Sequence, residues 1–420
     1  MTLTRRAVCS ILPAGLLAGC AVGHAQTSTS ILRALADGAP GDRVPASGFI
    51  ILNAEGAPIA AQAYGWASGL SDGETRDGIP RRDFGVTTPF RAASISKLVV
   101  AMSTAHLARA GTVDLDGDLR TWMPDFPRHP DFPDTVITLR MVLSHTSSLQ
   151  DPDIYWVAHP GSIYDIIQPD LYRPETRPGS RFEYCNFGYG IAATALEAAT
   201  GQRFDQIARE LVLAPAVLDA GFNWSGVSAS KRASGATLYT EGSEGWEVQT
   251  DGPDRLTASA PAILIDEGAD LSTYTPGQNG TLFSPQGGLR ASLLDLARIA
   301  HMLPAYPDLV TPVWMLNPTA DNGDHDQRYF TAFGTGVQTH TADESIWPGQ
   351  RLIGHHGEAY GLYAGAWHAP ELGISFAYAV TGTPETPPAR STDHPALNRF
   401  TAPLMQAVRA AYASRSPANR

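Results

Sequence analysis

Ser94 and Lys97, which lie three positions apart, are the residues whose types and spacing best suit nucleophilic chemistry. The apolar residues beside them recur at helical spacing: Ile95, Leu98, Val99 and Met102. A helix that begins close to Ser94 puts the hydroxyl and the amine on one face, roughly 5–6 Å apart at Cβ, where the amine can take the hydroxyl proton. Backbone N–H groups converge at a helix N-terminus and can stabilise an oxyanion. Taken alone, a serine cap followed by a surface lysine gives the same pattern.

Two further motifs extend this chemistry along the chain. Tyr184 and Asn186 lie about 90 residues after Ser94 and precede an alanine-rich stretch, 191–200, that predicts a helix. A phenol can relay a proton between a serine and a leaving group, and a carboxamide can bind a substrate amide or carbonyl. The third motif, His355-His356-Gly357, lies in a strand-rich C-terminal part.

Other patterns that suggest chemistry have better structural explanations. Gly69-Leu70-Ser71-Asp72-Gly73 matches the nucleophile elbow, but loop-forming residues follow it where that motif needs an apolar helix. His145 lies beside several hydroxyl residues, which is typical of a loop that caps its own backbone. His355 and His356 are adjacent, so on a strand they point to opposite faces. We therefore expect no metal site and no cofactor.

Composition limits the class of partner. The 420 residues are 43% hydrophobic and 17% charged, which is ordinary for a folded globular chain. The net charge of −12 repels nucleic acid and anionic membranes, and no basic run counteracts it. We expect a small-molecule or peptide substrate and no nucleic-acid partner.

Residues 1–25 are predicted to be an export signal. Arg5 and Arg6 supply the charged start, and residues 11–17 supply an apolar stretch too short to span a membrane. Leu17-Ala18-Gly19-Cys20 resembles a bacterial lipoprotein box, which would make a lipidated Cys20 the first mature residue; cleavage after Ala25 is the alternative. We expect an exported, periplasmic protein that touches the membrane only through this lipid. Processing would leave Cys185 as the one ordinary thiol, so no intrachain disulfide is expected.

The order of the three motifs, with predicted helices in the middle and strands at both ends, resembles the serine β-lactamase and penicillin-recognising superfamily. It is most similar to the branch of class C β-lactamases, D-Ala-D-Ala carboxypeptidases and related esterases. The resemblance implies an α+β fold: an antiparallel sheet flanked by helices beside an all-helical lobe, with the active site between them. We expect one catalytic domain, 31–415, with a sheet lobe at about 31–93 and 286–415 and a helical lobe at about 94–285.

The resemblance also implies a role for each matched residue. Ser94 is the acylated nucleophile, Lys97 accepts its proton, and Tyr184 moves protons to the leaving group and from the hydrolytic water. The residues implied to bind substrate are Asn186, His355, His356 and Gly357, and the backbone N–H groups of Ser94 and Glu358 form the oxyanion hole. A lysine acts as base only if its pKa falls from about 10.4. The sequence leaves open whether Lys97 or Tyr184 is the working base.

Two departures from the family's pattern affect these expectations. The third motif is His-His-Gly where Lys-Thr-Gly or His-Thr-Gly is usual, so His356 lacks the hydroxyl that grips a substrate carboxylate. We therefore expect β-lactam turnover to be slow or absent. Ser148 stands where the family usually has glycine, which predicts a variant turn.

The leading hypothesis is an exported serine hydrolase that acts through acyl-Ser94 on small esters or on peptide or amide substrates. D-Ala-D-Ala carboxypeptidase and β-lactamase activities are the alternatives within the family. The alternative of another class is a non-catalytic penicillin-binding-type protein. Such a protein has no need to keep Ser94, Lys97 and Tyr184 together.

Overall fold

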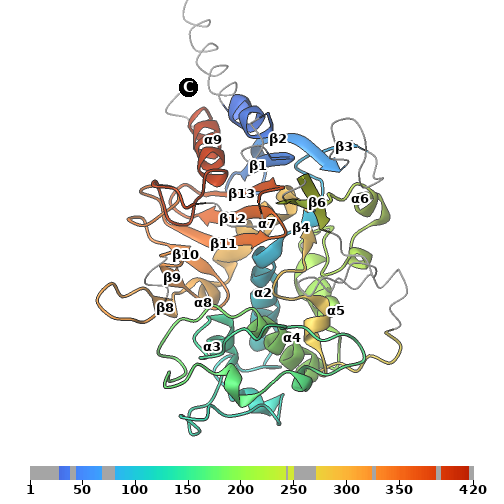
Figure 1. Cartoon of the computed structure of the whole chain (residues 1–420), viewed down its shortest axis with the longest axis vertical. Coiled ribbons are helices and arrows are strands. Elements are labelled where there is room, and N and C mark those ends of the chain that lie inside the picture. The colour runs from blue at the N-terminus through green and yellow to red at the C-terminus, as the bar shows by residue number, and fades with distance from the viewer. Residues whose placement is uncertain are drawn as a thin grey trace, which may run out of the picture.

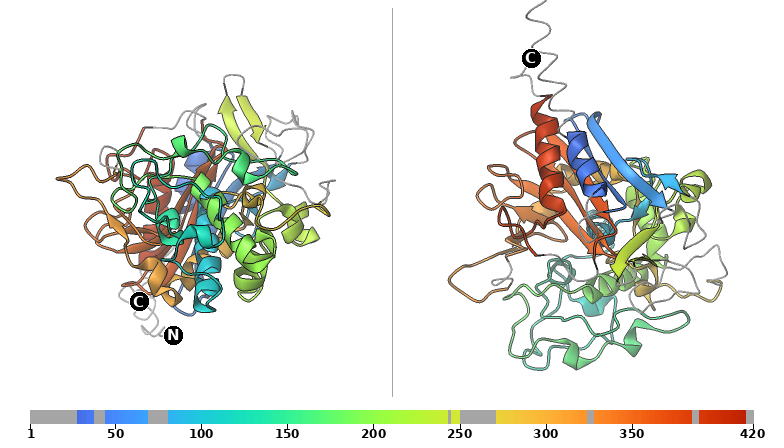
Figure 2. Two further views of the ribbon diagram at one scale, coloured as in Figure 1. Left: turned by 90° about the horizontal axis from the view of Figure 1, so that it is seen from below. Right: turned by 45° about the horizontal axis from the view of Figure 1, so that its top comes forward.

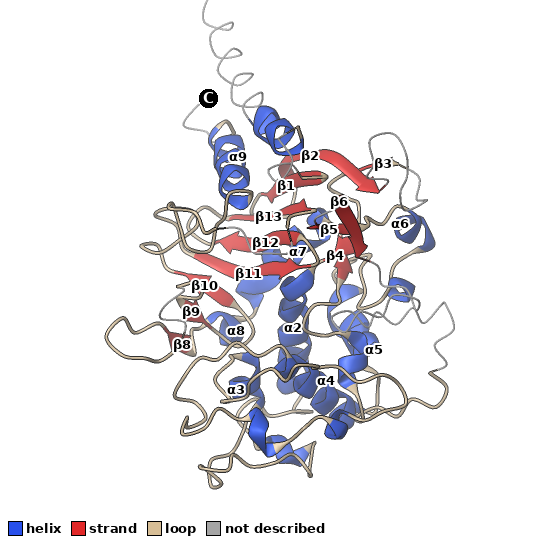
Figure 3. Ribbon diagram, in the orientation of Figure 1, coloured by secondary structure: helices blue, strands red, loops and turns tan. Residues whose placement is uncertain are grey.

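The computed structural model describes residues 28–37, 44–68, 81–242, 245–249, 271–323, 328–384 and 389–415. The predicted export signal, with Cys20, and the Gly69–Gly73 motif lie outside these residues. Strands gather in the upper part of Figure 1, with two helices above them, and most other helices lie in the lower part; Figure 3 shows the same division by colour.

An antiparallel sheet is the frame of the protein. Within the described residues it has nine strands in the order β3-β2-β1-β13-β12-β11-β10-β9-β8. The long central strands are β1 (Ala46–Leu52), β2 (Pro58–Ser68), β11 (Leu352–Ala359), β12 (Leu362–Ala369) and β13 (Ile374–Thr381). The short strands at the edges are β3 (Arg82–Asp83), β8 (Trp314–Met315), β9 (Ala332–Phe333) and β10 (Gln338–His340). β1 pairs with β13, with Ala46 opposite Thr381. The first and the last of these strands are therefore neighbours in the middle of the sheet.

Both faces of the sheet are buried, as the alternation along β1 shows. Ile50 and Leu52 join the core that the sheet shares with the helical part, whereas Phe49 and Ile51 join a second core on the opposite face. A helix over residues 28–36 and α9 (Thr401–Ala413) lie side by side over the second core (Figure 2). α7 (Leu293–Met302) packs on the other face.

The helical part is organised around α2 (Ser96–Arg109), which is buried along most of its length. α4 (Phe187–Thr200), α5 (Phe204–Ala208) and α8 (Pro307–Val310) contact α2, and α3 (Leu139–Leu143) contacts α4. The short α6 (Ala229–Ala233) has no buried residue. No helix in the described ranges is long and apolar enough to cross a bilayer.

The predicted fold class is confirmed: a helical part lies beside an antiparallel sheet that has helices on both faces. One difference lies within the stretch expected to be helical, where β5 (Leu238–Gly242) and β6 (Gly245–Gln249) form a hairpin that contacts β12 and β13. The Tyr239 carbonyl oxygen of this hairpin packs so closely on Gly361 that a Cβ there would lie only 2.0 Å away. The hairpin is therefore held by contacts with residues distant in the sequence. Local periodicity does not encode such a contact.

Candidate active site

Ser94 lies in a short 3-10 turn (Ala93–Ile95) directly before α2, so the α-helix begins at Ser96 and not at Ser94. Ala93 has φ +48°, a left-handed conformation that is unfavourable for a residue with a Cβ. The Ser96 hydroxyl holds this turn, because Oγ donates to the Ala93 carbonyl (2.6 Å) and accepts from the Leu289 N–H (2.9 Å). The strained turn places Ser94 two residues before the start of α2, and Lys97 still lies one helical turn after Ser94.

Lys97 is fully buried, and three oxygen atoms surround its nitrogen. Nζ lies 2.9 Å from Ser94 Oγ, 2.9 Å from Asn186 Oδ1 and 2.8 Å from the Gln286 carbonyl oxygen. The amide and carbonyl oxygens can only accept, so a neutral amine donates its two N–H groups to them and turns its lone pair toward the Ser94 hydroxyl. Burial lowers the pKa of Lys97 to about 7. A large fraction of the amine is therefore neutral near pH 7, as a general base requires.

Asp151, which the sequence analysis did not single out, fixes the orientation of Asn186. Its carboxylate accepts from Asn186 Nδ2 (2.9 Å) and from the backbone N–H of Phe187 at the start of α4 (2.7 Å). The amide oxygen of Asn186 is consequently left facing Lys97. The negative charge of Asp151 also partly opposes the lowering of the Lys97 pKa by burial.

Tyr184 provides the second polar contact of Ser94. Its Oη lies 2.9 Å from Ser94 Oγ. Burial raises the pKa of the Tyr184 phenol far above its usual value, so the group stays protonated and acts as a donor. These opposite pKa shifts favour Lys97 as the base and Tyr184 as the proton relay, a choice that the sequence leaves open.

His145, interpreted from the sequence as part of a capped loop, supports Tyr184 directly. The two rings pack with centroids 4.3 Å apart. His145 Nδ1 accepts from the Cys185 N–H (3.0 Å), and its carbonyl accepts from the Glu183 N–H (2.7 Å). Burial lowers the pKa of His145 well below its usual value, so the ring is neutral. His145 is a positioning residue for Tyr184, and Ser148 in the same loop takes the glycine-like φ of +67°.

The free edge of β11 brings the third motif to Ser94. β10 pairs with β11 only as far as Gly354, so the residues that follow have no strand beside that edge within the described ranges. Gly357 permits the close approach, because a Cβ there would lie 2.7 Å from the Ala92 carbonyl oxygen. Glu358, whose backbone N–H is predicted to complete the oxyanion hole, comes next and lines the same cavity as Ser94.

His355 projects from β11 toward the aromatic rings around Tyr184, with ring centroids 6.4 Å from Tyr184 and 5.7 Å from Phe333. Its Nδ1 donates to the His356 carbonyl oxygen, which leaves Nε2 as an acceptor with no partner among the described residues. Burial and the nearby Lys97 lower the pKa of His355 to about 3, so the ring is neutral.

His356 takes the opposite face of the sheet, as expected for a strand neighbour of His355. Its Nδ1 lies 3.3 Å from Tyr378 Oη and its Nε2 lies 3.4 Å from His340 Nε2, and the residue is 4% exposed. Both ring nitrogens are therefore engaged on the face of the second core, although the residue also borders the cavity that contains Ser94. The described residues hold no group of three or more His, Cys, Asp or Glu side chains that could bind a metal ion.

Comparison with known proteins identifies the family of this chain. A family model described as Beta-lactamase matches residues 32–398. The chain belongs to the beta-lactamase family. The superfamily resemblance of its motifs is thereby confirmed.

Two curated relatives of this beta-lactamase-family chain are hydrolases. Esterase EstB of Burkholderia gladioli is 30% identical over 257 residues, which cover 54% of this chain and 61% of the esterase. The D-alanyl-D-alanine-carboxypeptidase/endopeptidase AmpH of Escherichia coli is 30% identical over 151 residues, which cover 34% of this chain and 39% of AmpH. The matched part thus spans less than two thirds of either relative. The D-amino acid amidase from Ochrobactrum anthropi shares the fold, with a TM-score of 0.63 over 94% of this chain and 100% of the amidase at 19% identity.

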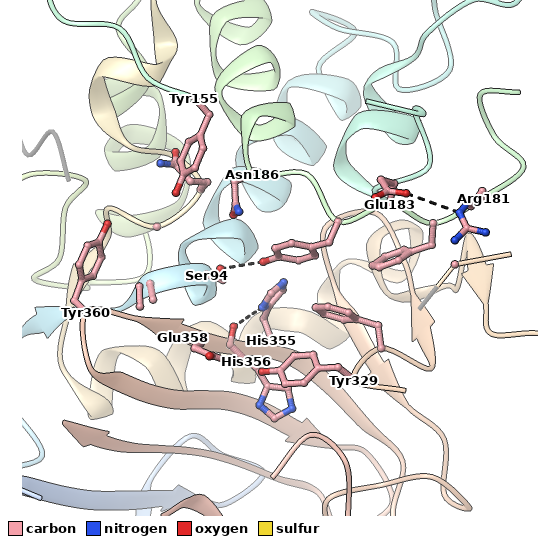
Figure 4. Close-up of a pocket in the computed structure, with 18 of the residues that line it drawn as sticks. Ser94, Tyr155, Arg181, Glu183, Asn186, Tyr329, His355, His356, Glu358 and Tyr360 are labelled. Atoms are coloured by element: carbon pink, nitrogen blue, oxygen red, sulfur yellow. Dashed lines mark hydrogen bonds and ion pairs between the residues drawn. The ribbon is translucent and has the colours of Figure 1, made fainter. Parts of the chain in front are cut away.

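The beta-lactamase-family site opens into a cavity of about 640 Å³ (Figure 4). Of the predicted site residues, those that line the cavity are Ser94, Tyr184, Asn186, His355, His356 and Glu358. Lys97 and Gly357 are not part of its lining. Lys97 is buried within hydrogen-bond distance of Ser94, and Gly357 lies against the backbone of Ala92. The structure therefore brings the three sequence motifs to one place.

The cavity also contains residues that the sequence analysis missed. Apart from Tyr184, its aromatic lining is Tyr155, Phe182, Tyr329, Phe330 and Tyr360, and its further charged lining is Arg173, Arg181, Glu183 and Arg390. Single aromatic residues in loops carry no periodic signal. Only Phe182 and Glu183 could have been suspected, because they directly precede Tyr184.

Proposed function

We propose that this protein hydrolyses small esters through an acyl-Ser94 intermediate. The observation that carries the proposal is the position of Ser94 Oγ, which lies 2.9 Å from Lys97 Nζ and 2.9 Å from Tyr184 Oη in an open cavity. A partly neutral amine and a protonated phenol supply the two proton transfers that acyl transfer needs. The names of the relatives EstB and AmpH support ester and peptide substrates as the two classes to test.

Acylation begins when Lys97 takes the Ser94 proton and Oγ attacks the substrate carbonyl carbon. The carbonyl oxygen gains negative charge, which the backbone N–H groups of Ser94 and Glu358 are proposed to stabilise. The bond to the leaving group then breaks, and the leaving oxygen receives the Tyr184 proton. Lys97, now an ammonium ion, returns a proton to the Tyr184 phenolate through the departing alcohol, so both groups regain their starting protonation states.

Deacylation repeats these steps with water in place of Ser94. The phenol–lysine pair removes a proton from water, the hydroxide attacks the acyl carbon, and Ser94 leaves with a proton. One water molecule is consumed, and one acid and one alcohol are released. His355 and His145 are neutral and serve this cycle by shaping the cavity and by positioning Tyr184.

We predict a preference for esters over β-lactams. The third motif has no hydroxyl, and the His356 ring is engaged with Tyr378 and His340, so it offers no hydrogen bond to a substrate carboxylate. Loss of one charge-assisted hydrogen bond weakens a substrate by roughly ten- to a hundredfold. We expect kcat/KM for p-nitrophenyl butyrate to exceed that for a chromogenic cephalosporin by at least about tenfold.

Equal or faster cephalosporin turnover would contradict this preference, while acylation of Ser94 by either substrate would keep the hydrolase proposal. Exchange of His356 for threonine is a poor test. It removes a ring buried at 4% exposure and leaves Tyr378 and His340 without their partner. The variant is expected to lose stability before any change in substrate choice can be measured.

Peptide or amide hydrolysis, as the name of AmpH suggests, is the second candidate within the family. A non-catalytic penicillin-binding role is the alternative of another class. It predicts that a p-nitrophenyl ester forms a stable acyl-Ser94 adduct without turnover. Steady-state release of p-nitrophenol over many equivalents of protein excludes that alternative.

We also propose that the protein is exported to the periplasm with Cys20 as a lipid attachment site. The support is the N-terminal sequence, with Arg5 and Arg6 ahead of an apolar stretch and a lipoprotein-type box. Determination of the mature N-terminus in the native host tests it. A diacylated Cys20 supports the lipoprotein, Gln26 supports a secreted form instead, and an intact Met1 overturns export.

A further inference from the structure

The position of Tyr184 defines the two sides of the site. A leaving group must come within hydrogen-bond distance of the Tyr184 phenol to receive its proton. The leaving group of a substrate bound at Ser94 therefore lies on the Tyr184 side, and its acyl group extends away from Tyr184. This step rests on the proposed function.

Two tyrosines occupy the acyl side. Figure 4 places Tyr155 and Tyr360 on one side of Ser94 and His355 on the other, and both tyrosines line the cavity. The Tyr184 ring lies on the His355 side, with the two ring centroids 6.4 Å apart. Tyr155 comes from the loop that follows Asp151 in the helical part, and Tyr360 comes from the turn between β11 and β12. Burial raises the pKa of Tyr155 to about 12, and the nearby Tyr360 adds to the shift. The helical part and the sheet thus each present an aromatic ring to the same cavity.

The backbone of Tyr360 is strained. Ala359 pairs with Leu362, so Tyr360 and Gly361 form a two-residue turn, with φ of +59° and +68°. Such turns favour Asn, Asp or Gly at the first position, because a bulky residue is unfavourable at positive φ. A large aromatic side chain at this position is not explained by the turn.

A buried arginine holds the ring of Tyr360 in place. The Arg91 guanidinium lies 4.3 Å from the ring centroid, and Arg91 is 4% exposed. Arg91 itself donates to the Gly287 carbonyl (3.2 Å) and to Ser284 Oγ (3.1 Å). The Tyr360 ring thus packs on a guanidinium group that is itself held by hydrogen bonds, even though the Tyr360 backbone is strained.

The space continues past the two tyrosines. A second cavity of about 290 Å³ is lined by Tyr155, Ala359 and Tyr360 as well, and it extends to Thr240, Tyr363 and Thr383. The two cavities share Tyr155, Glu358, Ala359 and Tyr360 in their linings, and residues of the β5–β6 hairpin bound the second cavity.

We propose that Tyr155 and Tyr360 form an acyl clamp that selects substrates with a flat aromatic or extended apolar acyl group. The two rings cover the faces of that group, and the second cavity receives its far end. The clamp deepens the proposed function by naming the acyl class, and it makes Tyr155 and Tyr360 specificity-determining residues. The apolar area buried between the rings gives the preference its driving force.

The test compares acyl groups on one leaving group. We measure kcat/KM for p-nitrophenyl acetate and p-nitrophenyl phenylacetate with the wild type, Tyr360→Asn, Tyr155→Ala and Tyr155→Phe. Asparagine adopts the positive φ readily, so Tyr360→Asn removes the ring and keeps the turn. We expect the ratio of kcat/KM for the phenylacetate to that for the acetate to fall at least about tenfold in Tyr360→Asn and in Tyr155→Ala. In Tyr155→Phe, which keeps the ring, this ratio should stay near the wild-type value.

Val217→Asn is the matched control for strain relief. Val217 has φ +54°, is 82% exposed and does not line either cavity, so this exchange should leave the acyl ratio unchanged. An equal loss for both esters in Tyr360→Asn, or no change in the ratio, overturns the clamp while Ser94 acylation still stands. Absence of any acyl-Ser94 adduct in the wild type overturns the proposed function and the clamp with it.

Discussion

Ser94→Ala is expected to abolish acylation and to lower ester turnover by at least about 10⁴-fold. The reason is geometric: Ser94 Oγ is the atom that lies within 2.9 Å of both Lys97 Nζ and Tyr184 Oη. Without that oxygen the acyl group has no acceptor, and what remains is a cavity with an oxyanion site. The measurement is intact-protein mass spectrometry after reaction with a fluorophosphonate, together with the release of p-nitrophenol.

Ser71→Ala is the control, because Ser71 lies in the competing Gly-x-Ser-x-Gly motif. We expect its adduct mass and rate to match those of the wild type. Thermal unfolding of Ser94→Ala should stay cooperative as in the wild type, since the Ser94 side chain contributes to no core cluster; any shift comes from the lost hydrogen bonds to Lys97 and Tyr184. A labelled Ser94→Ala protein together with an inactive Ser71→Ala protein would move the nucleophile to the other motif.

The nucleophile could be predicted from the sequence because its geometry is local. The Ser94–Lys97 pair needs only one helical turn, and this spacing survives even though the α-helix begins two residues later than expected. The fold followed from the order of the motifs and from strand patterns at both ends of the chain. The β1–β13 pairing in the centre of the sheet is the physical form of that order.

The supporting groups could not be predicted, because they reach the site across long separations. Asp151 bonds to Asn186 from 35 positions away, and the Gln286 carbonyl bonds to Lys97 from 189 positions away. A carboxylate in a loop and a main-chain carbonyl leave no pattern in the sequence. Their effect is nevertheless large, since they decide which way the Lys97 lone pair points.

His356 shows the limit of strand alternation as a guide. Alternation predicts that His355 and His356 point to opposite faces, which is confirmed. It does not say whether the face that carries the His356 side chain is open to a ligand or covered by other residues. Tyr378 from β13 and His340 from β10 cover it, and both neighbours depend on the strand order of the finished sheet.

Lys97→Ala and Tyr184→Phe are each expected to lower kcat/KM by at least about 10²-fold, the usual effect of losing a general acid or base. The two variants should differ in their dependence on pH. The pKa of Lys97 is about 7, and its neutral form is the base, so wild-type kcat/KM should rise as pH increases through about 7. Tyr184→Phe should keep this rise, because the lysine remains. Lys97→Ala should lose it.

Two further variants test whether the pH dependence of kcat/KM comes from Lys97. Asp151 raises the Lys97 pKa, so Asp151→Asn should move the rise in kcat/KM to lower pH. The chain has one other lysine, Lys231, which pairs with Asp295 (2.7 Å) away from the cavity. Lys231→Arg should therefore leave both the rate and the pH profile unchanged. If Lys97→Ala keeps the rise near pH 7 and Tyr184→Phe loses it, the tyrosine is the base and the assignment of the two roles is reversed.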